Sequence, residues 1–239
     1  MRKYLIVFVL LMLVVWIGCK PRHPSEITMD PEFDPNNVGS ILVAPFISSV
    51  SEGQDEDRKS ERIMNRVLFD LISERTDHRF LSPEQFRMAV RKAGLAEEYE
   101  TFKNHWITKH EVDKNFLRRL QGNLDIDLLL VPHVYLWLKD EADYRELGTA
   151  SSTQVGATLT LIDFSSGTTM WEATDENYKE SVRTEGDREQ SSAAGPPRRI
   201  SGVTVTGRDM YAAPPFEDVA LLVLKILVDA IPMKGTLEE

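Results

Sequence analysis

Cysteine is almost absent from this chain of 239 residues, because Cys19 is its only one. A single thiol cannot form an internal disulfide bond, so a small disulfide-stapled scaffold is excluded. The five histidines are scattered, and no two of them have the spacing of metal ligands. We expect His110 to face solvent and His133 to be a hydrogen-bonded histidine of a strand. We therefore predict no metal site and no cofactor.

The recurring motifs of catalytic and nucleotide sites are missing as well. There is no Gly-x-Ser-x-Gly elbow, no P-loop and no dinucleotide-binding glycine pattern. Asp55-Glu56-Asp57 lacks the glycine and the distal glutamate of a calcium-binding loop, so we interpret it as a solvated helix start. Asp125 and Asp127 have the spacing of paired carboxylates, but we interpret them as a solvated turn. We predict no catalytic residue.

Positive charge is in the minority. The chain has 28 lysines and arginines against 38 aspartates and glutamates, which gives a formal net charge of -10. This balance argues against nucleic-acid binding and against adhesion to anionic lipid by charge. Arg198-Arg199 is a local candidate for an anionic contact, which we interpret as loop surface. With 42% hydrophobic residues, the chain is able to bury a substantial core.

The most apolar stretch lies at the N-terminus. Arg2 and Lys3 give a basic start, the residues from Tyr4 to Gly18 carry no charge, and Cys19 follows. A basic start, an apolar run and a small residue before a cleavage point are the parts of a secretory signal. The run is shorter than the roughly 20 residues of a membrane-spanning helix. The alternative interpretation is an uncleaved N-terminal membrane anchor.

This stretch resembles the bacterial lipoprotein signal, in which cleavage precedes a cysteine that receives a lipid on its sulfur. Ile17-Gly18 matches the pattern, whereas Trp16 departs from the leucine that is usual there. The resemblance implies cleavage before Cys19, lipidation of Cys19 and attachment to a membrane through that lipid. In this family an aspartate directly after the lipidated cysteine signals retention in the inner membrane. Lys20 stands at that place, so the resemblance implies sorting to the periplasmic face of the outer membrane.

Composition divides the chain into four parts. We predict a signal peptide over residues 1–18 and a lipidated cysteine with a flexible tether over 19–37, where four prolines stand among polar residues. Residues 38–232 are predicted to form a single periplasmic α/β domain, and 233–239 a tail. Domains usually hold about 50 to 250 residues, so one domain is sufficient.

Hydrophobic periodicity predicts an α/β fold, with a mixed β-sheet of about five strands and helices packed on it. Expected strands and hairpin arms are Ile41–Val43, His78–Leu81, Leu128–Leu138, Ser151–Asp163 and Thr168–Ala173, with a short extra strand at Val203–Val205. Expected helices are Arg58–Arg75, Pro83–Ala93, one after a capping box at Thr108–Glu111, and Val219–Ile231. Leu95–Ile107 is left as an irregular connection or a short helix. Pro132 is expected to mark a bulge or an exposed edge.

Three segments of this pattern resemble one group of periplasmic lipoproteins. They are the strand Ile41–Phe46, the entry Leu124–Leu130 to the long strand, and the hairpin from Gly156 to Trp171. The group shares the fold of the curli-secretion channel protein CsgG, the N-terminal domain of TolB and the lipoprotein activators of penicillin-binding proteins. The resemblance implies binding of other envelope proteins or assembly into oligomers, and it supplies no catalytic residue.

Three functional hypotheses follow. The first is a non-enzymatic outer-membrane lipoprotein that binds or regulates another envelope protein, with Val203–Val205 and the loop Ser181–Pro197 as candidate contact regions. The second is a subunit of an oligomeric CsgG-like secretion channel, in which case the chain forms a homo-oligomer. The third, an enzyme of the envelope, has no supporting constellation of residues.

Overall fold

A mixed sheet of seven strands forms the centre of the computed structural model, which describes residues 23–122, 124–141, 150–181, 199–200, 203–204 and 212–235. In chain order the elements are β1 (Glu26–Met29), the 3-10 turn η1 (Pro35–Asn37), β2 (Ser40–Val43), β3 (Ile47–Ser48), the 3-10 turn η2 (Glu56–Arg58), α2 (Lys59–Ser73), β4 (Arg79–Leu81), α3 (Pro83–Ala93), α4 (Ala96–Lys109), α5 (Lys114–Gln121), β5 (Leu128–Asp140), β6 (Ser152–Asp163), β7 (Thr169–Glu180), β8 (Arg199–Ile200), β9 (Val203–Thr204) and α7 (Phe216–Asp229). None of these helices is long and apolar enough to cross a membrane, within the residues described.

The strands are ordered β1-β7-β6-β5-β2-β4, and β3 also pairs with β5. The pairs β1–β7, β7–β6 and β6–β5 are antiparallel, whereas β2 is parallel to β4 and β5. The α/β class and the mixed sheet are thus as predicted. The strand count exceeds five because β1 and the two-residue β3 gave no periodic signal. β8 and β9 form a separate two-stranded sheet, so the extra strand is found at Val203–Thr204.

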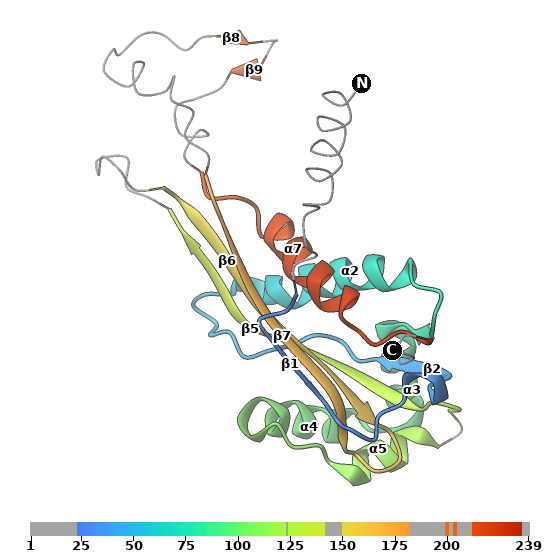
Figure 1. Ribbon diagram of the computed structural model, residues 1–239. Helices are drawn as coiled ribbons and strands as arrows, with labels where there is room; N and C mark the ends of the chain where they lie inside the picture. Colours follow the sequence, from blue (N-terminus) through green and yellow to red (C-terminus); the bar gives the residue numbers. More distant parts are fainter. Residues whose placement is uncertain are drawn as a thin grey trace, which may run out of the picture.

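Helices cover both faces of the sheet, so the protein has three layers and two cores (Figure 1). Along β2, Ile41 and Val43 point to α2 and α7, whereas Leu42 points to α3, α4 and α5. Since successive side chains of a strand point to opposite faces, an unbroken apolar run needs helices on both sides. The long apolar run of β5 is buried in the same way.

Helix ends follow the local sequence in most places. Ser82 forms the predicted capping box with Gln85, and Gly94 ends α3 in the left-handed region at φ 67°. The capping box predicted at Thr108–Glu111 is wrong. α4 continues through Lys109, and the Thr108 hydroxyl donates to a carbonyl one turn back. The next helix, α5, is capped by the carboxylate of Asp113 instead.

Pro132 lies inside β5 without breaking it. It is in register with Leu159 of β6, and the bulge falls later, between Val134 and Leu136, so the prediction of a bulge at Pro132 is wrong. The carbonyls of Leu130 and Val134 accept hydrogen bonds from the β2 and β3 side of the sheet. Because alternate residues point the same way, the missing N–H of Pro132 faces the gap between β2 and β3. The pairing of β2 with β5 ends at Leu130 and that of β3 begins at His133, so Pro132 lies between the two ladders.

The predicted flexible tether is wrong in its second half. Glu26–Met29 forms β1, which pairs with β7 from Trp171 to Thr174, and Phe33 is buried in the core beneath α7. Pairing at an open sheet edge requires only backbone groups, and this explains how a segment without apolar periodicity joins the sheet. The folded body therefore begins close to residue 25 and not at residue 38.

Candidate functional site

The lipidation site and most of the predicted contact loop lie outside the described residues. Cys19 precedes the first described residue, and so does the proposed cleavage point. The loop Ser181–Pro197 is described only at Ser181, and of Arg198-Arg199 only the backbone of Arg199, in β8, is described. The structure therefore leaves Cys19 and this loop as predictions.

The acidic residues singled out in the sequence have structural roles. The carboxylate of Asp55 accepts hydrogen bonds from the backbone N–H and the hydroxyl of Ser60, so it stabilises the start of α2. One oxygen of Asp127 accepts from the backbone N–H groups of Gly39 and Ser40, at 2.7 and 2.8 Å. Asp125 is exposed, and its backbone carbonyl accepts from the Ser40 hydroxyl. The two aspartates thus fasten the start of β2 beside β5 and do not converge on a substrate.

His133 lies in the middle of β5. It is buried on the α3–α5 side, and its Nε2 lies 2.9 Å from the hydroxyl of Ser49. Burial, reinforced by the nearby ring of His110, lowers the pKa of His133 to about 4. His110 is exposed, as predicted, and its ring centre lies 6.0 Å from that of His133. No three His, Cys, Asp or Glu side chains form a candidate metal site in the part of the chain that is described.

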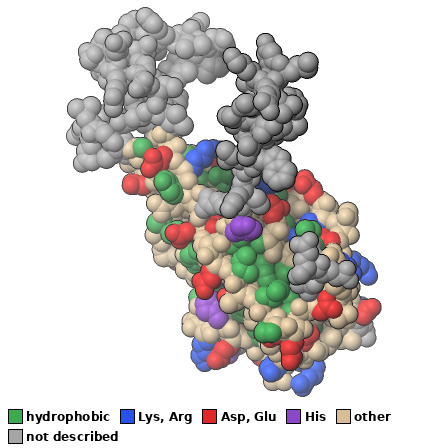
Figure 2. Space-filling view, in the orientation of Figure 1, with side chains coloured by type: hydrophobic (Ala, Val, Ile, Leu, Met, Phe, Trp, Pro, Cys, Tyr) green, Lys and Arg blue, Asp and Glu red, His purple; other side chains and the backbone are tan. Residues whose placement is uncertain are grey.

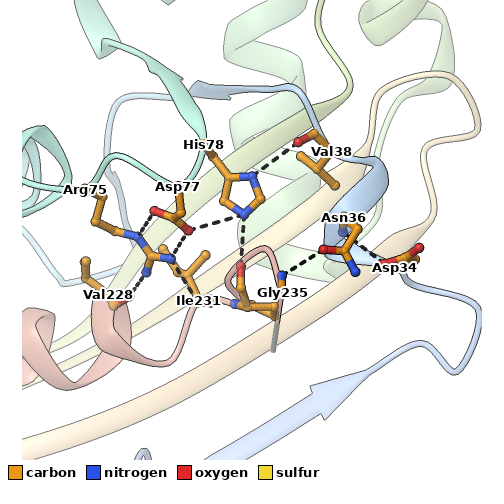
Figure 3. Close-up of polar contacts among 10 residues, drawn as sticks. Asp34, Asn36, Val38, Arg75, Asp77, His78, Val228, Ile231 and Gly235 are labelled. Carbon is orange, nitrogen blue, oxygen red and sulfur yellow. Dashed lines mark hydrogen bonds and ion pairs between the residues drawn. The ribbon is translucent and has the colours of Figure 1, made fainter. Parts of the chain in front are cut away.

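A polar cluster that the sequence did not indicate fastens the end of α7 (Figure 3). The guanidinium of Arg75 donates to the carbonyls of Val228 and Ile231 and forms a fork with the carboxylate of Asp77. Both carbonyls lie at the C-terminal end of α7 or just beyond it, where a cation is favoured. Burial alone raises the pKa of Asp77, but the hydrogen bond and charge of Arg75 outweigh it, and the pKa lies below the usual value.

His78 completes this cluster, which we call the α7 clasp (Arg75, Asp77 and His78). Its Nε2 lies 3.0 Å from the carbonyl of Pro232, and its Nδ1 lies 3.3 Å from that of Val38. All its partners except Asp77 are backbone carbonyls, and the ring of His78 is buried. The clasp therefore holds the C-terminal helix against the connection between α2 and β4, and it is a structural site.

A groove of about 320 Å³ lies between α2 and α7. Its apolar residues are Val67, Leu71 and Leu221. Its acidic residues are Asp70, Glu74, Glu217 and Asp218. Glu217 pairs with Arg66 at 3.5 Å and Asp218 with Lys179 at 2.7 Å, both at the surface. This α2–α7 groove thus combines an apolar floor with a rim of carboxylates, and it suits a ligand with apolar and basic groups.

A second groove of about 300 Å³ lies between α3 and α4. Phe86, Val90 and Tyr99 supply its apolar surface, and Arg87 and Arg91 stand one turn apart on α3. Burial raises the pKa of Tyr99, so the phenol is neutral. Arg87 is already paired with Glu84, and Lys103 lies over the ring of Tyr99. This groove mixes both signs of charge and does not select a ligand by charge.

Comparison with known proteins shows similarity at the level of structure. No protein-family model matches the chain, and a search of curated proteins gives no match. Lipoprotein GNA1162 from Neisseria meningitidis is 18% identical, with a TM-score of 0.43 over 64% of this chain and 92% of that one. PelC from Paraburkholderia phytofirmans, solved as a dodecamer, is 13% identical, with a TM-score of 0.36 over 85% and 94%.

The C-terminal domain of LpoB from Salmonella enterica is also similar, at 11% identity and a TM-score of 0.33 over 62% of this chain and 86% of that domain. At these identities and TM-scores the likenesses carry no argument about function. The specific resemblance to CsgG and TolB stays a prediction.

Proposed function

We propose that this protein is a non-enzymatic lipoprotein of the bacterial envelope that binds another envelope protein through the α2–α7 groove. A lipid on Cys19 fixes it at the periplasmic face of the outer membrane. The leader before Cys19 supports the anchoring, because a basic start, an apolar run and a small residue precede the cysteine. Asp55 and Asp127, which the sequence offered as candidates for a chemical role, make structural hydrogen bonds to backbone N–H groups.

The charge pattern of the groove is the observation that carries the binding proposal. Leu221 is exposed on α7, outside the buried face of that helix that supplies the core. Asp70 and Glu74, on the same side of α2, have no ion pair within the described residues. A partner segment with an apolar side chain between lysines or arginines would bury Leu221 and pair these carboxylates. We therefore infer a basic amphipathic helix of an envelope protein as the partner.

Site-specific crosslinking in cells tests this proposal. A photocrosslinking residue placed at position 221 in the lipidated protein is expected to capture a defined envelope protein. Reversing the rim charges with Asp70→Lys and Glu74→Lys is expected to abolish that product. Phe69→Lys is the matched control, because Phe69 lies on the outer side of the same helix and does not line the groove.

The same product after charge reversal would show that the groove is not the binding surface. Deleting residues 182–197 tests the second candidate region separately, because the cut falls beyond the paired part of β7. We expect this deletion to spare folding and to weaken capture of the partner. Unchanged partners after the deletion would remove the loop from the proposal.

A further inference from the structure

Strand β1 exposes apolar side chains at the open edge of the sheet. Ile27 and Met29 are exposed by 46% and 47%. By register they share a face with Ala173 and Trp171, which is the face that α7 covers. Glu26 and the other polar residue of β1 share the opposite face. Apolar side chains on an exposed strand are stabilised only when they are removed from water. The apolar face of β1 therefore indicates contact with another apolar surface.

The neighbouring flank of α7 extends this apolar surface. α2 packs on the side of β5 and α7 packs on β6 and β7, so the flank of α7 away from α2 faces the β1 edge. Leu221 lines the groove with α2, and Leu222 and Ile226, one turn apart, lie on the other flank. Leu222 is 44% exposed and Ile226 is half-buried. Figure 2 shows hydrophobic side chains gathered between α7 and β1.

Four side chains therefore form what we call the β1–α7 strip (Ile27, Met29, Leu222 and Ile226). It lies beside the point where the chain leaves toward Cys19. Seven residues from Cys19 to Glu26 span at most about 25 Å, even when fully extended. A domain of about 200 residues has a radius of gyration of about 16 Å and a diameter of roughly 40 Å. The anchor is thus too short for the body to turn freely away from the membrane.

We propose that the β1–α7 strip rests on the surface of the lipid bilayer that holds the Cys19 lipid. This inference rests on the acylation of Cys19 in the proposed function, and it adds the orientation of the body. The short chain brings the strip to the headgroup region, and apolar side chains are favoured there over water. The chain is net negative, so the contact is apolar and does not depend on anionic lipid. Lys225 and Asp229, exposed on the same helix, limit the contact to the interface.

Depth-dependent fluorescence quenching tests the orientation in the full lipidated protein. A cysteine introduced at Met29 or Leu222 is the only free thiol when Cys19 is acylated, so an environment-sensitive dye labels it alone. Met29→Cys and Leu222→Cys report on the strip. Met88→Cys on α3, 53% exposed, and Phe69→Cys on α2, 46% exposed, are matched controls away from it. Each is reconstituted in phosphatidylethanolamine–phosphatidylcholine vesicles with and without brominated acyl chains.

We expect brominated lipid to quench the dye at positions 29 and 222 at least twofold and to leave positions 88 and 69 unchanged. Adding phosphatidylglycerol is expected to change none of these values. Equal quenching at all four positions, or none at 29 and 222, would overturn the proposal. A dye at position 29 that is shielded only when several proteins share a vesicle would identify a second copy as the occupant, and it would also overturn it.

An Ile27→Asp, Met29→Asp double variant checks the strip without relying on its own label. With the dye at position 222, quenching should fall by at least half, while far-ultraviolet circular dichroism stays unchanged because both residues are at the surface. Intact-mass analysis and vesicle flotation distinguish a failure of the lipid anchor from a failure of the proposed orientation. An unmodified Cys19 refutes the anchor in the proposed function, whereas an acylated protein that floats with unquenched strip labels refutes only the orientation.

Discussion

The two helical layers are built from different kinds of side chain. Beneath α3, α4 and α5, Phe102 stacks against Tyr99, Trp106 and Phe116, with ring centres 5.1 to 6.2 Å apart. Beneath α2 and α7 the helices contribute mainly aliphatic residues, with Phe216 stacked on Trp137 as the aromatic exception. α7 also carries exposed leucines and borders the acidic groove. The difference teaches that the α3–α5 layer is held together by a stack of aromatic rings, whereas the α2–α7 layer holds both surfaces that are proposed to meet a partner and a membrane.

The largest expected effect is the difference in unfolding free energy between a substitution in the aromatic α3–α5 layer and one on the exposed flank of α7. Phe102→Ala should destabilise the fold by about 3–5 kcal/mol, because it removes the ring at the centre of the aromatic stack and leaves a cavity. Leu222→Ala, on the exposed flank of α7, should cost less than about 1 kcal/mol. Urea unfolding of both variants measures the contrast. Similar costs would mean that the layers do not differ in this way.

The clasp is the next largest expected contribution, and it belongs to the α2–α7 layer. Arg75→Ala should cost about 3 kcal/mol, because it leaves two helix-end carbonyls and the carboxylate of Asp77 without their buried partner. Arg75→Lys should recover part of this, since a lysine retains the charge but not the fork. Hydrogen exchange of the last turn of α7 is the local readout. Unchanged protection there in Arg75→Ala would show that packing alone holds the helix.

Acid should weaken the α3–α5 layer through His133. Its pKa of about 4 in the folded protein lies below the 6.5 of the unfolded chain, so the unfolded chain takes up the proton first as pH falls. The stabilisation is complete above pH 6.5 and is lost between pH 6.5 and about 4, by roughly 2–3 kcal/mol. His133→Gln should flatten the stability profile in this window. Parallel profiles for the two proteins, measured by urea unfolding, would contradict the assignment.

The smallest expected effect is at the surface of the α2–α7 layer. Lys179 on β7 pairs with Asp218 at the start of α7, and both side chains are nearly half exposed. Lys179→Ala should cost no more than about 0.5 kcal/mol at low salt, and nothing measurable in 1 M salt, where the pair is screened. A cost above about 1 kcal/mol that persists in high salt would show that the pair, and not the clasp, positions α7.

The fold class was predictable because its signals are local. The alternating run of β6, the turn at Gly167 and the apolar period of α7 each lie within a dozen or so residues, and each is found as predicted. β1 cannot be predicted from the sequence, because a four-residue edge strand is held by backbone pairing with β7 and has no apolar period of its own. The sequence of α4 does not distinguish a helix from an irregular connection, because its buried side chains lie on one narrow stripe around Phe102 and Trp106.

The surfaces were harder to predict than the elements, because they join distant parts of the chain. Leu71 and Leu221 line one groove, but their helices, α2 and α7, are far apart in the sequence. The donors of Arg75 reach carbonyls of α7, and no short-range pattern links such positions. An available signal was the pair Leu221-Leu222, which continues the apolar run of α7 past the face that the core needs.

The pairing of β1 with β7 has a consequence for the order in which the protein is made. A chain synthesised from its N-terminus presents β1 among its first structured residues, yet the strand has no neighbour until β7 arrives, and α7 follows later still. Contacts between such distant segments close slowly, and open sheet edges aggregate while they wait. The β1 edge of the sheet, which is nearest to the anchor, is therefore the last to be paired. A chaperone that binds the nascent chain would shield β1 for the longest time.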